Sequence, residues 1–263
     1  MKRRIIAALA AVALGAGLLA AGAASPATAS PQTVAKYVAL GDSIAAGQGG
    51  GAPLDACLRT TGGYAAQLDQ VPKVNLLRNA GCSGATIEDV WGQLSQVNRG
   101  TTVVTLTVGA NDLHLDQIYA ACVAVPSGGD INTCLGAIQG AKVAAPLLAV
   151  PLEALIDEIA VRAPNATIVV TGYPHLLEYV PDPVAPINGL IAELNGATDD
   201  LNDAIQAAAD AAGAEYADVV GAFAGHGIQL APVPSDPYFG PDLHPTYAGY
   251  TEYTNVIRAE LGL

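Results

Sequence analysis

Short runs of β-branched and other apolar residues alternate along the chain with longer Ala-rich stretches in which apolar residues recur at helical spacing. The short runs predict five strands: Tyr37–Leu40, Lys73–Leu77, Thr102–Val108, Thr167–Thr171 and Glu215–Val219. The longer stretches predict five helices: Gly63–Gln70, Ile87–Asn98, Ala149–Val161, Leu190–Ala212 and Tyr247–Leu261. This alternation is typical of βαβ units and a mainly parallel sheet. The middle three strands are dense in Val, Ile, Leu and Thr, so we expect them to be buried on both faces.

Glycine and proline mark some boundaries of these elements. Gly213 is placed to end the fourth helix, because glycine readily adopts the left-handed conformation that follows a helix. Pro146 and Pro151 should break or bend the stretch that leads into the third helix.

The N-terminal segment has the pattern of a targeting signal. Lys2, Arg3 and Arg4 precede an apolar run to about Ala24, and the small residues of Ala27-Thr28-Ala29 follow. A retained membrane anchor is the alternative, but the run is mostly Ala and Gly and the cleavage motif follows at once. We therefore expect residues 1–29 to be a signal peptide, cleaved after Ala29, and residues 30–263 to form one secreted domain with no membrane span.

Charge narrows the range of partners. Without residues 1–29 the chain has 8 Lys and Arg against 24 Asp and Glu, a formal charge near −16. A surface this acidic repels nucleic acid and anionic lipid headgroups. Nucleic-acid binding is therefore excluded, and we expect a soluble exported monomer.

Four cysteines follow the signal segment: Cys57, Cys82, Cys122 and Cys134. An even number in an exported chain predicts two disulfides, for which three pairings exist. We favour Cys57–Cys82 with Cys122–Cys134, because this pairing closes the shortest loops. A zinc site is disfavoured because the chain has no C-x-x-C pair and no His close to a Cys.

Residues suited to acyl transfer follow several predicted strands. The first strand leads into Gly41-Asp42-Ser43, and the third leads into Gly109-Ala110-Asn111-Asp112. A Gly-rich turn that contains Ser83-Gly84 follows the second strand, and His244-Pro245 precedes the last helix. Ligands of open α/β sheets bind beyond the carboxyl ends of the strands, so we expect these residues to meet at one edge.

Taken in this order, the four motifs resemble those of the SGNH (GDSL) hydrolases, with most similarity to secreted actinobacterial lipases and esterases. The resemblance covers nearly the whole chain after the signal segment, and the first two disulfides of those enzymes match the pairing favoured above. It implies a three-layer α/β/α fold with a five-stranded, mainly parallel sheet of flavodoxin-like type. It also implies hydrolysis of carboxylic esters without a metal or organic cofactor.

The resemblance assigns a role to each motif. Ser43 would attack the ester carbonyl, and His244 would take its proton and return it to the leaving alcohol. The oxyanion would be held by the backbone N–H groups of Ser43 and Gly84 and by the side-chain amide of Asn111. Glycine suits position 84 because it lets the backbone approach the developing charge without a Cβ in the way.

The partner of His244 departs from the family pattern. The usual carboxylate lies three residues before the histidine, where this chain has Pro241, and Asp242 lies only two before it. The imidazole can therefore be oriented by the Asp242 carboxylate, by a backbone carbonyl of Pro241 or Asp242, or by Asp236. We carry Asp242 as the third catalytic residue.

Each motif also has a structural interpretation. Gly41-Asp42-Ser43 can be an ordinary helix cap, with Asp42 as a hydrogen-bonding brace, and Asp112 should cap the helix that follows Asn111. Ser83 is the rival nucleophile, because Gly81-Cys82-Ser83-Gly84-Ala85 comes within one residue of the G-x-S-x-G elbow of α/β-hydrolases.

The remaining aromatic and imidazole residues carry weaker predictions. His114 can line the pocket or lie in a surface loop, His175 can face the cleft, and His226 should brace a loop. Trp91 lies on the second predicted helix, and we expect it to be core.

These observations predict a secreted lipase or esterase that acts on small-molecule or lipid esters. A polysaccharide deacetylase, a phospholipid acyl hydrolase and a non-catalytic binding protein are the alternatives. The segment from Asp112 to Pro151 is apolar and can be either a lid or ordinary core.

Overall fold

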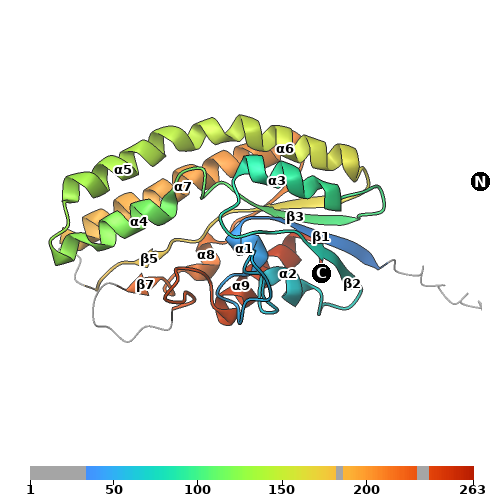
Figure 1. Cartoon of the computed structure of the whole chain (residues 1–263), viewed down its shortest axis with the longest axis horizontal. Coiled ribbons are helices and arrows are strands. Elements are labelled where there is room, and N and C mark those ends of the chain that lie inside the picture. Colours follow the sequence, from blue (N-terminus) through green and yellow to red (C-terminus); the bar gives the residue numbers. More distant parts are fainter. Residues whose placement is uncertain (1–33, 182–185, 230–236) are drawn as a thin grey trace, which may run out of the picture. The chain divides into compact units, whose positions relative to one another are not determined.

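The structure is a computed structural model that describes residues 34–181, 186–229 and 237–263 (Figure 1). The predicted signal segment, residues 1–29, and Asp236 lie outside the described residues. None of the helices in the described ranges has the length and hydropathy that crossing a membrane requires.

Five parallel strands form the main sheet, in the order β2-β1-β3-β4-β6. Their bounds are Ala35–Gly41 (β1), Val74–Asn79 (β2), Val103–Thr107 (β3), Thr167–Thr171 (β4) and Glu215–Ala217 (β6). The first strand lies second in the sheet, so the chain reverses its direction of travel between β2 and β3. This order is the flavodoxin-like one, in which ligands bind where the strand order reverses. The predicted fold class is confirmed.

Helices cover both faces of the sheet (Figure 1). One face carries α3 (Ile87–Gln93), α4 (Leu115–Val123), α5 (Ile131–Ala144), α6 (Ala149–Arg162) and α7 (Pro186–Ala212). The other carries α1 (Ser43–Ala46), α2 (Tyr64–Leu68), α8 (Val220–Phe223) and α9 (Tyr247–Glu260). The core lies between these layers, and all five residues of β3 are buried.

Shorter elements complete the described chain. Three 3₁₀ helices are present: η1 (Leu94–Gln96), η2 (Val125–Ser127) and η3 (Ala145–Leu148). A separate parallel pair joins β5 (Leu177–Glu178) to β7 (Ile228–Gln229). These two-residue strands are too short to produce a recognisable pattern in the sequence.

The prediction that the middle three strands are buried on both faces is wrong for the second strand. β2 is an edge strand, in which Leu77 and Arg78 are exposed. Apolar composition could not distinguish it from β1, which is flanked by β2 and β3 and buried from Tyr37 to Gly41. Strand order is a long-range property that local composition does not carry.

The segment between Asn111 and the predicted third helix is helical almost throughout. It forms α4 and α5, which contact each other, and then continues through η3 into α6. Pro146 lies in η3, where the hydrogen bonding changes from α to 3₁₀, and Pro151 lies in the first turn of α6, where no intrahelical N–H bond is lost. Gly213 ends α7 with φ +70°, as predicted.

Trp91 is not core, which corrects the sequence prediction. Its side chain is 43% exposed. α3 presents Ile87 and Val90 to the core, and Leu94 at the start of η1 continues this stripe at i+7. Trp91 lies one position beyond Val90 and so faces the side of the helix, where it borders a small hollow with Leu148 and Pro151.

Both disulfides follow the sequential pairing. Cys57 joins Cys82 and Cys122 joins Cys134. The second bridge connects α4 to α5. The first connects the loop after α1 to the loop after β2, which carries Gly84.

Candidate active site

The nucleophile candidate lies at a sharp turn between β1 and α1. Gly41 has φ +131°, and a Cβ there would lie 2.0 Å from the Thr107 carbonyl oxygen, so only glycine fits against β3. Asp42 is the N-cap of α1, and its Oδ1 accepts from the Ile44 N–H at 2.9 Å. Ser43 is the first helical residue, where backbone N–H groups lack intrahelical partners.

Asp42 braces this turn from within the core. Its Oδ2 accepts from the Tyr173 hydroxyl at 2.5 Å, and the same hydroxyl accepts from the Ala110 N–H at 3.3 Å. Tyr173 therefore connects the ends of β1 and β3, which lead to Ser43 and Asn111. Burial raises the pKa of Asp42 to about 6, against the opposing effect of the bond from Tyr173.

Ser43 and His244 form a hydrogen-bonded pair although they lie 201 residues apart. The Ser43 Oγ and His244 Nε2 atoms are separated by 2.8 Å. This is the nucleophile–base geometry expected of an activated serine.

The backbone carbonyl of Asp242, rather than its carboxylate, orients the imidazole. His244 Nδ1 lies 2.7 Å from Asp242 O and 3.7 Å from Asp242 Oδ2. Leu243, the residue between them, has φ +67°, and the Gly240 N–H donates to the His244 carbonyl at 2.8 Å. The tight turn thus brings the carbonyl next to the ring. Of the three partners left open by the sequence, the Asp242 carbonyl makes the contact, and Asp236 lies outside the described residues.

Burial also tunes His244. Removal from water lowers the pKa of the imidazole, while the bond to the Asp242 carbonyl and the nearby Asp242 carboxylate oppose that shift. The net direction is downward from the usual value of 6.5. The ring is therefore kept neutral, the form that can accept a proton from Ser43.

The residues predicted to hold the oxyanion lie around the same cleft as Ser43 and His244. Asn111 Nδ2 donates one hydrogen to the Ala85 carbonyl at 2.9 Å, which fixes the amide and leaves its second hydrogen for a ligand. Gly84 has φ +81°, and a Cβ there would meet no protein atom within 4 Å. Within the protein, backbone conformation rather than crowding is what requires glycine here.

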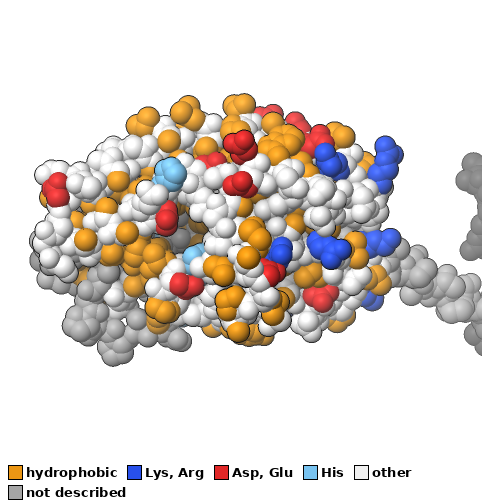
Figure 2. Space-filling model, in the orientation of Figure 1, with side chains coloured by type: hydrophobic (Ala, Val, Ile, Leu, Met, Phe, Trp, Pro, Cys, Tyr) orange, Lys and Arg blue, Asp and Glu red, His pale blue; other side chains and the backbone are white. Residues whose placement is uncertain are grey.

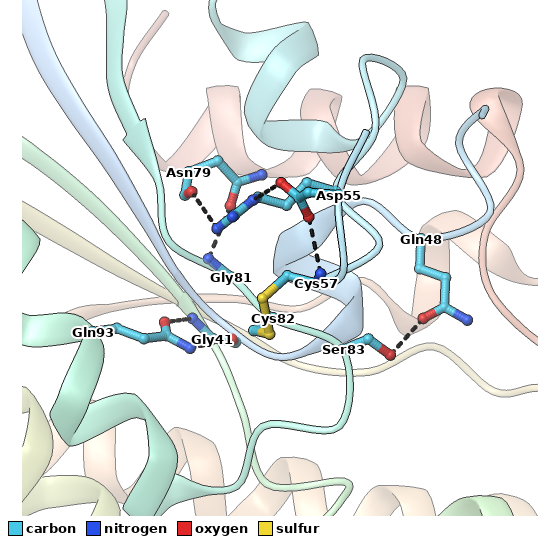
Figure 3. Close-up of a disulfide and its surroundings, with 10 residues drawn as sticks. Gly41, Gln48, Asp55, Cys57, Asn79, Gly81, Cys82, Ser83 and Gln93 are labelled. Atoms are coloured by element: carbon cyan, nitrogen blue, oxygen red, sulfur yellow. Dashed lines mark hydrogen bonds and ion pairs between the residues drawn. A yellow bond between two sulfur atoms is a disulfide. The ribbon is translucent and has the colours of Figure 1, made fainter. Parts of the chain in front are cut away.

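The loop that carries Gly84 is fixed at several points (Figure 3). The Cys82 N–H donates to the Gly41 carbonyl at 3.0 Å, and the Ser83 N–H donates to the Cys57 carbonyl at 3.1 Å. The Ser83 hydroxyl donates to Gln48 Oε1 at 2.7 Å rather than to an imidazole. The geometry thus favours Ser43 over Ser83 as the nucleophile.

Two glutamines in this region gave no signal in the sequence. The Gln93 side chain bonds both the N–H and the carbonyl of Gly41, each at 2.8 Å. Gln48 contacts Ser83 and also donates to Asp242 Oδ2 at 3.4 Å. Gln93 supports the turn before Ser43 and Gln48 supports the loops of Gly84 and His244, and neither glutamine belongs to a recognisable motif.

A cleft of about 310 Å³ opens from Ser43. In Figure 2, hydrophobic side chains gather beside a hollow between α4 and the β5–β7 pair. The apolar residues of the lining are Ile44, Ala110, Leu115, Ile118, Tyr119, Tyr173, Pro174, Leu176, Leu177, Leu194, Ala197, Phe239 and Leu243. The lining fits an apolar chain that ends in a polar group at Ser43.

Other predicted residues lie outside this cleft. His114 is exposed at the N-terminus of α4, and His175 Nε2 lies 2.6 Å from Asp199 Oδ1 on α7. His226 stacks on Tyr238 with ring centroids 3.9 Å apart, which is consistent with a loop brace.

Asp112 does not cap the helix that follows Asn111. Its carboxylate instead accepts from the Ile87 N–H at 3.1 Å, at the N-terminus of α3. Sequence proximity misled this prediction, because the two segments meet only in the fold.

Comparison with known proteins places these features in a family context. Residues 39–251 match the GDSL-like Lipase/Acylhydrolase family. Lipase 2 of Streptomyces coelicolor is 34% identical over 219 residues, which span 74% of this chain and 73% of that protein. The matches span between 52% and 73% of the lengths of the curated Streptomyces lipases.

Two solved structures have the same fold over most of the chain. The extracellular lipase of Streptomyces rimosus superposes with a TM-score of 0.76 and 30% identity, covering 86% of this chain and 99% of that one. Phospholipase A1 of Streptomyces albidoflavus NA297 superposes with a TM-score of 0.72 and 29% identity, covering 87% of this chain and 100% of that one.

Proposed function

The chain belongs to the GDSL-like lipase/acylhydrolase family of ester hydrolases, and we propose that it cleaves carboxylic esters through an acyl-enzyme on Ser43. The 2.8 Å contact between Ser43 Oγ and His244 Nε2, at the mouth of an apolar cleft, carries this proposal. An acyl chain would lie in the cleft with its carbonyl carbon next to Ser43.

The reaction would proceed in two halves. Ser43 Oγ attacks the carbonyl carbon while its proton passes to His244 Nε2. The Ser43 and Gly84 N–H groups and the Asn111 amide stabilise the negative oxygen, and losing one such donor typically costs about 100- to 1000-fold in rate. The tetrahedral intermediate collapses when the C–O bond to the alcohol breaks and His244 protonates the leaving oxygen. Water, deprotonated by His244, then releases the acid and restores the serine.

The Asp242 carbonyl would serve as the third member of this machinery. By accepting from Nδ1–H, it holds the tautomer in which Nε2 is free to accept a proton. A carbonyl stabilises the imidazolium less than a carboxylate does, so its main contribution would be orientation.

Lipid esters are the favoured substrates, because the cleft lining is predominantly apolar. A phospholipid acyl hydrolase is the second candidate. It is favoured by the similarity to phospholipase A1 of Streptomyces albidoflavus, at 29% identity over 87% of this chain.

We further propose that the enzyme is exported as a single domain of residues 30–263. The signal pattern at residues 1–29 and the two disulfides support this proposal, because disulfides persist in oxidising compartments.

Covalent labelling tests the nucleophile. A fluorophosphonate should modify Ser43 in the wild type, as located by peptide mass spectrometry, and should fail to label Ser43→Ala. Ser83→Ala is the matched control and should label normally. Labelling that survives in Ser43→Ala and disappears in Ser83→Ala would reject the assignment.

A further inference from the structure

A second groove, of about 640 Å³, lies beside the catalytic cleft. The two hollows share Ser83 and Gly84, so the loop that would hold the oxyanion separates them. Figure 3 shows part of the surroundings of this groove, with Asn79, Cys82, Ser83 and Gln93 labelled. Unlike the cleft, whose lining is mostly apolar, the groove combines small residues with long polar side chains, including two arginines.

The first arginine, Arg59, is held in place. Its Nε donates to Asp55 Oδ2 at 2.8 Å, and its Nη1 donates to the Asn79 carbonyl at 3.2 Å. A guanidinium has five N–H groups, so three remain for a ligand. Two fixed bonds reduce the side-chain entropy that binding an anion would cost.

The second arginine, Arg78, is exposed on the edge strand β2. In the described ranges it makes no ion pair and no side-chain hydrogen bond. Asp89 also lies in the groove wall, but its carboxylate is bound by the N–H and hydroxyl of Thr86. Arg59 is paired with Asp55, and the bonds from Thr86 lower the pKa of Asp89, which therefore keeps its negative charge. The formal charge of the groove is thus near zero, and Arg78 is its one guanidinium without an ion-pair partner among the described residues.

The charge distribution places this groove in the least acidic part of the chain. Residues 34–100 contain five Lys or Arg and five Asp or Glu. Residues 101–263 contain three Lys or Arg and nineteen Asp or Glu. Figure 2 shows Lys and Arg side chains gathered toward the end of this face where β1 and β2 lie in Figure 1. The overall negative charge therefore repels an anion less here than elsewhere.

We propose that this groove binds the alcohol half of the substrate when that half carries a phosphate or a similar oxyanion, which Arg59 and Arg78 contact. The inference rests on the proposed function. If the acyl chain fills the apolar cleft and its carbonyl oxygen faces Gly84, the alcohol can extend across Ser83 and Gly84 into the groove. Arginine suits this ligand because its planar fork binds phosphate oxygens in pairs.

Kinetics with matched esters test the subsite. Dihexanoyl phosphatidic acid and dihexanoylglycerol share their acyl chains and differ only in the phosphate. Arg78→Gln should raise KM for the phospholipid about tenfold, the low end of the effect of losing a hydrogen bond to a charged group, and leave the neutral ester unchanged. Arg99→Gln is the matched control, because Arg99 is exposed and lies outside the groove. It should change neither substrate.

Three outcomes separate the possibilities. Equal effects of Arg78→Gln on both esters, or no effect on either, would overturn the proposal. If inorganic phosphate inhibits the wild type but not Arg78→Gln, and the wild type does not prefer the phospholipid over the neutral ester, the groove is a site for free phosphate. That result would also overturn the proposal. p-Nitrophenyl hexanoate carries no phosphate and reports on the catalytic centre alone. Its hydrolysis by the wild type thus distinguishes failure of the subsite from failure of the proposed function.

Discussion

His244 Nδ1 lies 2.7 Å from the backbone carbonyl oxygen of Asp242 and 3.7 Å from that residue's carboxylate. The carbonyl is part of the chain and survives any substitution at position 242. Toward the imidazole, the carboxylate contributes only a longer-range attraction, from a side chain that is 43% exposed and so well screened by solvent. Its hydrogen bonds are long ones, from the His244 backbone N–H and from Gln48 Nε2, each at 3.4 Å. The orientation of the His244 imidazole thus depends on the turn from Gly240 to His244 rather than on the Asp242 side chain.

Asp242→Asn should therefore lower kcat/KM by less than about tenfold, whereas misorienting a triad histidine can cost about 10⁴. Steady-state hydrolysis of a soluble ester measures the effect. His244→Ala is the control and should abolish turnover. A loss of a thousandfold or more in Asp242→Asn would assign the orienting role to the carboxylate.

The pH profile should reflect the buried imidazole. Activity requires the neutral imidazole, so kcat/KM should fall as the pH is lowered and His244 becomes protonated. Because burial lowers the pKa of His244, the midpoint of this fall should lie below pH 6.5. The Asp242 carboxylate raises this pKa, so Asp242→Asn should move the midpoint to lower pH. A wild-type midpoint above 6.5, or an upward shift in the variant, would contradict this account.

Asp42 should make stability depend on pH in the direction opposite to a salt-bridged aspartate. Its pKa is raised from 3.8 to about 6, so the folded protein binds a proton that the unfolded chain has released in this window. The free energy of unfolding should therefore fall as the pH rises from about 4 to 6. The fall should be on the order of 3 kcal/mol, since each unit of pKa difference between the folded and unfolded states corresponds to about 1.4 kcal/mol. Asp42→Asn should lack this contribution. Urea denaturation of both proteins at pH 4 and pH 7 gives the comparison, and parallel pH dependences would refute it.

Gln48 links the loop of Gly84 to the loop of His244 through Ser83 and Asp242. A Cβ at the adjacent Gly49 would lie 3.0 Å from His244 Cβ, so this loop also packs directly against the base. Gln48→Ala should lower kcat about three- to tenfold with little change in KM, since two modest hydrogen bonds at roughly 0.5 kcal/mol each total about 1 kcal/mol. Gln139→Ala, at an exposed position on α5, is the control. An effect on KM alone would argue for substrate contact instead.

The cleft should limit acyl-chain length. Thr198 is a partly exposed residue of α7 that lines the cleft. Thr198→Phe should shorten the preferred acyl chain of p-nitrophenyl esters and leave hydrolysis of the acetate nearly unchanged. If all chain lengths lose activity equally, the cleft is not the acyl site.

The sequence was most informative where local pattern and chemistry coincide. Strand Thr167–Thr171 has the predicted bounds, and the motifs at Ser43, Asn111 and His244 all line one cleft. It was least informative about long-range geometry. The edge position of β2 depends on strand order, and the orienting carbonyl depends on a left-handed residue, Leu243, which carries no signal of its own.

Some supporting residues were equally hidden. Tyr173 braces Asp42 from the loop after β4, and Gln93 reaches Gly41 from a helix, so neither lies near its partner in the sequence. Trp91 was misplaced because its helix buries a narrow stripe that composition alone does not locate.

The most direct test is hydrolysis of p-nitrophenyl esters, from acetyl to palmitoyl, by purified residues 30–263 beside Ser43→Ala. The account predicts turnover that peaks at one chain length in the wild type and disappears in the variant. Turnover that persists in Ser43→Ala, or a folded wild type that hydrolyses none of the series, would contradict it.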